Sequence, residues 1–296
     1  MVDSMTRVAV ISTNNRVYGV NKSLELLDIN PVKGKNVILK PNFNTADPPP
    51  ASSSIETVKQ LVLKLKDMGA ESITLAERAG PAKTSEVFKK IGLFDLAEEL
   101  NFKIVDLTDV HDEDYVLKNP EGNHWKDGFL FAKIYDEAEC IVETCCLKTH
   151  MYGGRFTISL KNAVGLVNKK NMSELHSSNY QREMIAEINC VYKPDLIVMD
   201  GIVAFVDRGP MEGTRVEANV FVTGTDKIAI DAVGVAILRI LGTTPEVTNG
   251  SIFEQDQIKR AVELGLGVRS PKDIEFLTDS EESEKLIAQM KEKLAQ

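Results

Sequence analysis

Basic side chains are concentrated in one stretch near the middle of the chain. No Asp or Glu occurs between Thr144 and Ser173, whereas Lys148, His150, Arg155, Lys161, Lys169 and Lys170 all fall there. Lysine, arginine and protonated histidine are the side chains that hold phosphate and carboxylate groups. We therefore expect an anion site in this stretch. The alternative is a solvated basic face whose lysines contact carboxylates elsewhere.

A glycine pair in the same stretch predicts a backbone contribution to this site. Gly153 and Gly154 precede a predicted helix whose apolar face is Phe156, Leu160, Ala163, Val164 and Val167. The first N–H groups of a helix lack intrahelical partners, and the helix dipole favours an anion beside them. We expect Lys148 and Lys161 to clamp the anion and His150 to act as general acid or base. His176 is the second histidine close to this stretch, and the spacing of the two fits no zinc motif.

Polar residues also follow several predicted strands. Glu77 follows Ile73–Ala76, Asp200 follows Leu196–Met199, and Lys40-Pro41-Asn42 follows Val37–Leu39. Ligands of open α/β sheets settle outside the carboxyl ends of the strands, so these side chains are candidates for ligand contact. Each could instead cap the next helix or close a turn.

Three further positions combine polar chemistry with an unusual setting. The loop Asp207–Gly213 contains Gly209 and Gly213, which permit unusual backbone angles and close approach to a ligand; a plain connection to the next strand is the alternative. Asp226, after Thr225, is placed to cap the following helix. Asp231 lies among apolar residues of that helix and needs a partner, such as a lysine or a metal ion. A structural ion pair or an exposed facet is the other interpretation of Asp231.

The elements that must position these residues follow an α/β pattern. Short β-branched runs at residues 8–11, 37–39, 72–75, 102–105, 140–142 and 196–199 alternate with helical patterns. Such runs are typical of a mostly parallel or mixed sheet covered by helices on both faces. Helices are predicted at residues 55–68, 184–192, 226–241 and 251–264, and a last helix opens at Asp279-x-x-Glu282.

Domain boundaries are weakly marked. We treat residues 1–296 as a single domain with two lobes, 1–145 and 146–296, that enclose a polar cleft. The polar segment His111–Gly128 is predicted as a hairpin or insertion, and Pro48–Ser54 as a mobile surface loop within a lid from Thr45 to Ser54.

Composition excludes several classes of protein. The formal charge of -9 repels nucleic acid and anionic membrane surfaces. No apolar run approaches the roughly 20 residues that cross a bilayer. The polar start Met1 to Thr6 leaves no room for a secretory signal, which predicts an unexported, cytoplasmic protein. Oligomeric state is not determined by any of these features.

The spacing of the cysteines and the absence of several known motifs exclude further kinds of site and classes of enzyme. Cys140, Cys145, Cys146 and Cys190 form no C-x-x-C pair, so we interpret them as reduced core thiols; a cluster built from all four is the alternative. The chain contains no G-x-x-x-x-G-K-[ST], G-x-G-x-x-G, G-x-S-x-G or H-E-x-x-H sequence. The commonest nucleotide, hydride-transfer, serine-hydrolase and metalloprotease interpretations are thereby removed.

Motifs over about 190 residues resemble a known family. They are Leu39-Lys-Pro-Asn42, Glu77, Leu147-Lys-Thr-His150, Ser159-Leu-Lys-Asn-Ala-Val-Gly165, His176, Val198-Met-Asp-Gly201, Gly209-Pro-Met-Glu-Gly213 and Thr225-Asp-Lys-Ile-Ala-Ile-Asp231. Their order and spacing resemble the family grouped as domain of unknown function number 362. The resemblance implies signature positions at Lys40, Asn42, Glu77, Lys148, Thr149, His150, Lys161, Asn162, Asp200, Gly209, Gly213, Asp226 and Asp231. Of these we expect Lys148, His150 and Lys161 to be catalytic and the others to bind the ligand.

The resemblance also bears on cofactors. Many members of that family resemble fusions with a ferredoxin-type segment, but this chain lacks the C-x-x-C-x-x-C run, so no iron-sulfur cluster is expected. The family is distantly similar to the cofactor-binding half of nickel-dependent lactate racemase, which implies, by analogy, a carboxylate substrate and a bound organic cofactor. A divalent cation held by Asp200 and Asp231 remains open.

Three functions follow as hypotheses. The first is an enzyme acting on a small anionic, phosphate- or carboxylate-bearing metabolite. The second is a non-catalytic carrier of a cofactor, metal ion or iron-sulfur cluster, which convergence of the four cysteines would favour. The third is a scaffold, which predicts a large exposed apolar patch and a poorly formed polar site.

Overall fold

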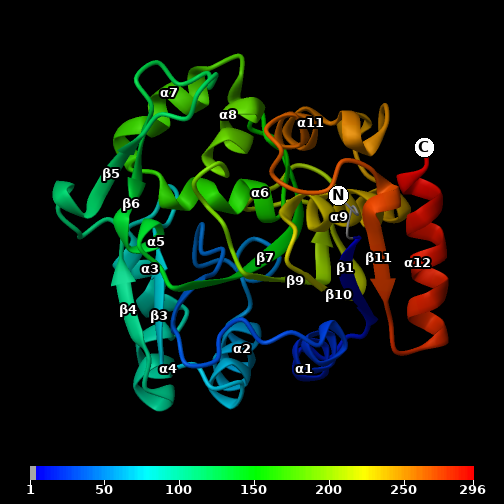
Figure 1. Ribbon diagram of the computed structural model, residues 1–296, viewed down its shortest axis with the longest axis horizontal. Coiled ribbons are helices and arrows are strands. Elements are labelled where there is room, and N and C mark those ends of the chain that lie inside the picture. Colours follow the sequence, from blue (N-terminus) through cyan, green and yellow to red (C-terminus); the bar gives the residue numbers. More distant parts are fainter. Residues whose placement is uncertain (1–4) are drawn as a thin grey trace.

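One large sheet organises the protein (Figure 1). The computed structural model describes residues 5–296, so the first four residues of the polar start lie outside the described part. The strands are β1 (Thr6–Ser12), β2 (Asn36–Lys40), β3 (Ser72–Glu77), β4 (Lys103–Asp106), β5 (Tyr115–Lys118), β6 (Phe129–Ala132), β7 (Cys140–His150), β8 (Arg155–Thr157), β9 (Leu196–Phe205), β10 (Arg215–Gly224) and β11 (Ile274–Leu277).

Strand pairing makes this sheet mixed. Its order is β11-β1-β10-β9-β7-β2-β3-β4, with β8 added to β7, while β5 and β6 pair separately. The strands β4, β3, β2, β7 and β9 run parallel to one another, whereas β10 is antiparallel to both β9 and β1, and β8 is antiparallel to β7. The expected α/β fold with a mostly parallel or mixed sheet is confirmed.

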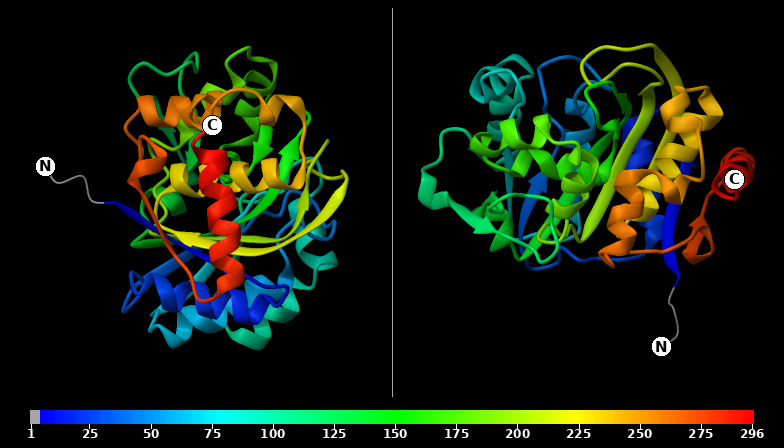
Figure 2. Two further views of the ribbon diagram at one scale, coloured as in Figure 1. Left: turned by 90° about the vertical axis from the view of Figure 1, so that its right-hand side faces the viewer. Right: turned by 90° about the horizontal axis from the view of Figure 1, so that it is seen from above.

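Helices cover both faces of the sheet (Figure 2). They are α1 (Arg16–Leu27), α2 (Ile55–Asp67), α3 (Thr84–Lys90), α4 (Leu93–Leu100), α5 (Lys133–Asp136), α6 (Ser159–Asn162), α7 (Met172–Ser177), α8 (Gln181–Ile188), α9 (Lys227–Leu241), α10 (Pro245–Thr248), α11 (Asp256–Glu263) and α12 (Glu281–Leu294). Helices α1, α2 and α4 lie below the sheet in Figure 1, and α6, α8, α9 and α11 lie above it.

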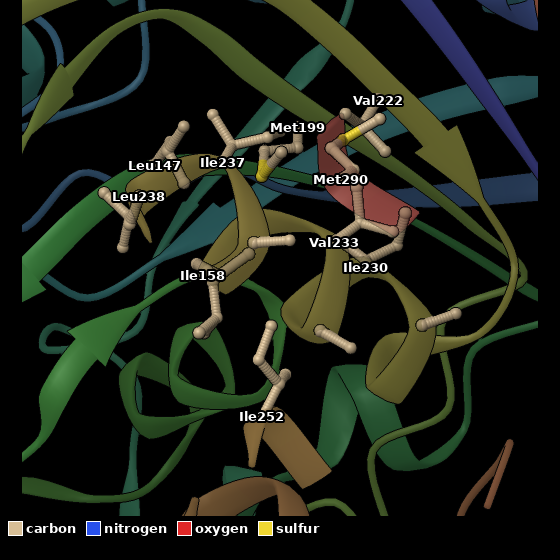
Figure 3. Packing of buried hydrophobic residues seen from close by; sticks show 14 of the residues in the cluster. Leu147, Ile158, Met199, Val222, Ile230, Val233, Ile237, Leu238, Ile252 and Met290 are labelled. Carbon is tan, nitrogen blue, oxygen red and sulfur yellow. The ribbon is translucent and has the colours of Figure 1, made fainter. Parts of the chain in front are cut away.

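The core divides according to the two faces of the strands. Val37 and Leu39 of β2 pack with α1, α2 and α4, while Ile38 between them packs with the β5-β6 pair and α8 on the other face. This alternation follows from the two-residue period of a strand. On the second face, α9 is buried over nearly its whole length against β1, β9 and β10 (Figure 3), with Met290 of α12 in the same cluster.

Two strands are longer than the sequence pattern predicts. β7 continues to His150 and is buried at every position, and β9 continues to Phe205. The apolar pattern stops at Val142 and Met199 because polar side chains follow, namely Glu143 and Asp200, yet the backbone remains extended. Asp200 therefore lies inside β9, opposite Phe221 of β10, rather than beyond the end of its strand.

The predicted helix after Gly153-Gly154 is wrong for its first turn. Arg155–Thr157 forms β8, which folds back on β7 and pairs Phe156 with Thr149. Only Ser159–Asn162 is α-helical, followed by a tighter turn to Leu166. The helix predicted from residue 184 begins earlier, at Gln181, and the last helix is capped by Ser280 rather than Asp279.

The Pro48–Ser54 tract lies at the surface only at its start, because Pro48 is exposed and the residues from Pro50 to Ser54 are buried. Ala51, Ser52, Ser53 and Ser54 are all buried. The Ser53 hydroxyl accepts a hydrogen bond from the backbone N–H of Asn42 at 2.9 Å, and the Ser52 hydroxyl donates to the Thr45 carbonyl at 2.6 Å. Serine content predicted exposure because these side chains are polar, but here they satisfy buried backbone groups.

Three further expectations concern the polar segment His111–Gly128, the division into lobes and membrane-spanning helices. The polar segment His111–Gly128 contains β5 and the loop that leads to β6, so it forms the first strand and the turn of a hairpin, one of the two predicted outcomes. The proposed boundary between lobes, at residues 145 and 146, falls inside β7, and the division into lobes stays a prediction. Among residues 5–296, no helix is both long and apolar enough to cross a membrane.

Candidate functional site

A cavity of 790 Å³ opens where three parallel strands end. Lys40 is the last residue of β2, Glu77 of β3 and His150 of β7, and β2 runs parallel to both neighbours. Carboxyl ends of parallel strands meet at one edge of a sheet, which is where ligands bind in open α/β folds. The polar lining residues include Lys40, Asn42, Glu77, Arg78, Lys148, His150, Lys161, Asn162, Lys169 and His176.

A buried ion pair forms one wall of this cavity. The Lys40 ammonium lies 2.7 Å from Glu77 Oε2 and also donates to the Pro41 carbonyl and to Asn162 Oδ1. Glu77 further accepts the backbone N–H groups of Phe43 and Arg78. Because both charges are buried and their hydrogen bonds are satisfied, the pair holds the ends of β2 and β3 together.

Lys148 contributes a second buried ammonium, without a carboxylate. Its Nζ donates to Asn42 Oδ1 at 2.7 Å and to the Ala51 carbonyl at 2.5 Å. Burial lowers its pKa from the usual value. The packed Ala51–Ser54 segment thus supplies a neutral oxygen to a lysine of the cavity.

Asn162 connects the lysines to a carboxyl group behind the cavity. Its Oδ1 accepts from Lys40 and from Asn42 Nδ2, and its Nδ2 donates to Glu143 Oε1 at 3.2 Å. Burial raises the pKa of Glu143 to about 7, against the opposing effect of Lys40. The amide is therefore fixed in one orientation by partners on both sides.

Lys161 contributes a third buried ammonium, and it differs from the other two. It lines the cavity with only 9% of its surface exposed, and its Nζ has no hydrogen bond or ion pair with any residue from 5 to 296. Burial lowers its pKa to about 8, and the charges of Lys148 and Arg78 act in the same direction. An amine held in this way is open to a ligand.

His150 lies next to Lys161. Its Nδ1 accepts the Gly154 N–H at 3.3 Å, which leaves Nε2 to carry the proton of the neutral ring. Burial lowers the pKa of His150 well below its usual value, and Lys161 and Lys148 lower it further. Gly154 shows how close the two side chains are, because a Cβ atom built there would lie 2.6 Å from Lys161 Cε and 3.0 Å from His150 Nδ1.

Arg78 also lines the cavity, and sequence reasoning missed it. Its guanidinium donates to the Ala79 and Val164 carbonyls and contacts Met172 Sδ, while its buried Nε has no partner within residues 5–296. Its place directly after Glu77, at a strand end, is the signal that could have identified it. Apolar lining comes from Tyr152, Val164, Met172, Pro210 and Met211.

Three predicted aspartates lie outside the cavity lining. Asp200 accepts from Arg16 Nε at 2.8 Å, from the Thr57 hydroxyl at 2.6 Å and from the Ile202 N–H. Asp226 caps α9 by accepting from the Ala229 N–H, as its position predicts, and also accepts from Val268. The contacts of Asp200 tie α1 and α2 to β9 instead of orienting the cavity lysines.

Asp231 is buried rather than exposed, and no lysine of the described chain pairs with it. Its Oδ1 accepts the backbone N–H groups of Ser159 and Leu160 at 2.8 and 3.1 Å, and its Oδ2 accepts from Gln257 Nε2. Burial raises its pKa to about 8. The N–H groups expected to be free for an anion at the start of this helix are therefore taken by a protein side chain.

Three remaining predicted positions, Gly209, Gly213 and Thr149, lie against backbone carbonyl groups of the chain. A Cβ atom at Gly209, whose φ is +60°, would overlap the Thr149 carbonyl, and one at Gly213 would overlap the Asp207 carbonyl. The Thr149 hydroxyl donates to the Phe205 carbonyl at 3.3 Å. The close approach at these glycines is thus to the protein backbone, and Pro210 and Met211 between them line the cavity.

Charge is unbalanced within the cavity. Lys40, Arg78, Lys148 and Lys161 are buried cations of the lining, and Glu77 is the one carboxylate among its residues in the described chain. The chain as a whole has a formal charge of -9, so this excess is local. Within a cavity lined by protein the effective dielectric constant is lower than in bulk water, so such an excess attracts an anion more strongly than it would at the surface.

The described part of the chain has no group of three or more His, Cys, Asp or Glu side chains arranged to hold a metal ion. All four cysteines are unpaired, and Cys145 and Cys146 are consecutive in β7, so their side chains point to opposite faces of the sheet.

Comparison with known proteins finds a family, a curated relative and solved structures that resemble this chain. Thylakoid-associated protein sll1697 of Synechocystis is 26% identical over 219 residues, which are 70% of this chain and 64% of that protein. The structure of the lactate racemase apoprotein from Thermoanaerobacterium thermosaccharolyticum aligns with a TM-score of 0.49 and 18% identity, over 74% of this chain and 54% of that one. That likeness is too low to inform on function. The family described as domain of unknown function (DUF362) matches residues 37–236, a range that contains every polar residue of the cavity lining, and the chain belongs to this family.

Proposed function

We propose that the protein is an enzyme that binds a small organic anion, bearing a carboxylate or phosphate group, in the cavity at the ends of β2, β3 and β7. The observation that carries this proposal is the partnerless ammonium of Lys161 in a cavity with excess positive charge. An ammonium group on a largely buried side chain, open to the cavity and without a protein partner, is poorly neutralised, so a ligand that supplies negative charge binds favourably.

The contacts favour a division of roles among the lining residues. Lys148, Lys161 and Arg78 hold the anion, since Lys40 is already paired with Glu77. Asn42 and Asn162 orient the lysines. His150, uncharged at neutral pH and beside Lys161, is the group that moves a proton. Tyr152, Met172 and Met211 provide apolar contact for the carbon skeleton of the ligand.

Location belongs to the same proposal. Four unpaired cysteines suit a reducing compartment, and the acidic overall charge suits a partner that is a small molecule rather than nucleic acid or membrane. We propose the cytoplasm on these grounds.

Thermal-shift and calorimetric titration with carboxylated and phosphorylated metabolites tests the binding. We expect a subset to bind, and Lys161→Met or Lys148→Met to weaken binding by tenfold or more, which corresponds to about 1.4 kcal/mol. Lys170→Met is the matched control, because Lys170 is exposed and pairs with Asp112 outside the cavity lining. Equal affinities in all four proteins would remove the proposal.

The variant His150→Gln distinguishes an enzyme from a carrier protein. For an enzyme, His150→Gln retains the bound anion and loses turnover, because glutamine keeps a hydrogen-bonding side chain but cannot exchange a proton. A carrier protein would show the same affinity in both proteins and no turnover of any bound metabolite in either.

A further inference from the structure

The three buried lysines of the cavity differ in how their Nζ atoms are occupied. Lys40 donates to Glu77, Pro41 and Asn162, and Lys148 donates to Asn42 and Ala51. Lys161 has no such contact within residues 5–296. Among these three, Lys161 alone keeps its nitrogen free for a bond to a ligand.

The surroundings of Lys161 favour its uncharged form. It is buried, and no carboxylate of the described chain pairs with it, whereas Lys148 and Arg78 place further positive charge nearby. Only the uncharged amine has the lone pair that attacks a carbon atom, and burial beside other cations is a recognised way of exposing that lone pair near neutral pH.

A proton-transfer group lies at the same place. Gly154 has no side chain, and the position its Cβ would occupy is within 3.0 Å of both Lys161 Cε and His150 Nδ1. A larger residue there would separate the lysine from the imidazole. The glycine in the turn between β7 and β8 therefore allows the side chains of Lys161 and His150 to lie close together.

From this geometry we infer that Lys161 is a covalent catalytic residue that forms an imine with the ketone or aldehyde group of an anionic substrate. The inference rests on the proposed function, because the substrate is the anion of the cavity. Its class is a small oxo acid or a phosphorylated carbonyl compound, with Lys148 and Arg78 on the anionic group and the carbonyl carbon at Lys161.

The step is balanced without any other reactant. Lys161 gives up one proton to its surroundings, and its nitrogen lone pair forms a C–N bond as the carbonyl π pair moves to oxygen. That oxygen takes a second proton from nitrogen to give a neutral carbinolamine. The hydroxyl group then takes up the proton released first and leaves as water when the C–O bond breaks, while the nitrogen lone pair forms the C=N bond. The lysine begins as an ammonium and ends as an iminium, and the two protons that leave nitrogen depart on the water. His150 is placed to relay the first of them.

The test is reductive trapping with borohydride, which converts an iminium to a stable secondary amine. The probes are pyruvate, 2-oxoglutarate and dihydroxyacetone phosphate, and the matched controls are lactate, 2-hydroxyglutarate and glycerol 3-phosphate, which lack the carbonyl group. Intact mass and peptide mapping are read after reduction. We expect one saturable adduct per chain, located on Lys161, with at least one probe and with none of the controls.

Two variants and one binding measurement complete the test. Lys161→Arg is expected to lose the adduct and Lys170→Arg to retain it; the peptide map of the unaltered protein locates the adduct even if Lys161→Arg fails to fold. Thermal shifts are recorded with all six compounds. Anion binding without an adduct on Lys161, or adducts spread over exposed lysines, overturns the imine and leaves the proposed function standing. Neither shifts nor adducts with any compound would overturn both.

Discussion

Lys40, Lys148 and Lys161 have the same chemistry and nearly the same burial, but the fold treats their charges differently. A carboxylate neutralises Lys40, neutral oxygens solvate Lys148, and Lys161 has neither in the described chain. The free energy cost of burying positive charge in the cavity is therefore greatest at Lys161. Proteins commonly retain such an unsatisfied group where it serves a function.

Replacing Lys161 by methionine is expected to stabilise the protein at pH 7. The pKa of Lys161 is about 8 in the fold and 10.5 as its ordinary value, so below pH 8 the folded protein bears the full cost of the buried charge. Between these values the unfolded chain holds more protons, and stability rises with pH. Lys161→Met should raise the free energy of unfolding by about 1 to 3 kcal/mol at pH 7, an effect that vanishes towards pH 10.

Chemical denaturation at both pH values measures this difference. Lys170→Met, at an exposed lysine, is expected to show no comparable dependence on pH. A gain for Lys161→Met that is the same at pH 7 and pH 10 would mean that packing, not charge, is responsible.

Asp231 gives the opposite dependence on pH. Its pKa is raised from 3.8 to about 8, so the folded protein binds a proton that the unfolded chain releases, and stability falls as pH rises through this range. Asparagine keeps an oxygen for the Ser159 and Leu160 N–H groups and has no charge. Asp231→Asn should therefore gain stability relative to the unaltered protein from pH 5 to pH 8.

Asp231→Ala separates the hydrogen bonds from the charge. It leaves two buried N–H groups without an acceptor and should cost about 2 kcal/mol or more at pH 5. Unfolding curves at pH 5 and pH 8 for the three proteins decide the matter; an asparagine variant that is as unstable as the alanine variant would contradict the assignment.

At the scale of elements, the sequence predicts the apolar parts of the strands. It does not predict the parts of the strands that contain polar residues of the candidate site. The apolar runs at residues 8–11, 37–39 and 72–75 correspond to β1, β2 and β3. For β7 the apolar pattern predicts only the first three residues, because Glu143, Thr144 and Lys148 interrupt it although all three are buried. The buried polar residues of β7 form hydrogen bonds with residues distant in sequence, such as Asn42 and Asn162. A local sequence pattern gives no information about such partners.

The candidate site was predictable to the extent that charge is local in sequence. Lys148, His150 and Lys161 share a stretch without acidic residues and meet in one cavity. Arg78 has no such signal, and Asp231 was given a lysine or metal partner because the Ser159 and Leu160 N–H groups that satisfy it become its neighbours only in the folded chain.

The loop Asp207–Gly213 allows a prediction about an element that shapes the cavity. Gly209→Ala places a Cβ on the Thr149 carbonyl and also strains φ, which is +60°. Gly250→Ala is the matched control, because its φ is +73° and nothing lies within 4 Å of its Cβ. The control should lose about 1 to 2 kcal/mol of stability from φ alone.

Gly209→Ala should lose more stability than this control and should also weaken anion binding, since Pro210 and Met211 move with the loop. Denaturation midpoints and calorimetric affinities provide both readings. Equal losses in the two variants would show that the loop yields without disturbing Thr149.

At the scale of the whole molecule, the family match and the folding unit differ in extent. The match covers residues 37–236, but β1 and β11 lie outside it and complete the sheet beside β10. Helices α1 and α12 also lie outside it and cover apolar residues on the two faces. All lining residues of the cavity lie within the matched range. The sheet that positions them also includes β1 and β11, which lie outside that range.

A fragment of residues 37–236 is therefore expected not to fold. It exposes the edge of β10 at Val220–Gly224, where β1 pairs, and it ends inside α9, which removes packing from the largest apolar cluster. Circular dichroism during heating should show no cooperative transition, whereas the chain of residues 5–296 should show one. A cooperative transition in the fragment would mean that the outer strands are accessory.

The position of β1 has a consequence for synthesis on the ribosome. Val8 pairs with Gly224 and Thr6 with Ile274, so this strand is translated long before either of its neighbours exists. Its apolar residues Val8 to Ile11, all buried in the finished protein, must wait unpaired while the other strands assemble. Chaperones that bind short extended apolar segments would find their substrate here, and its release would be timed by the emergence of β10 and β11 from the exit tunnel.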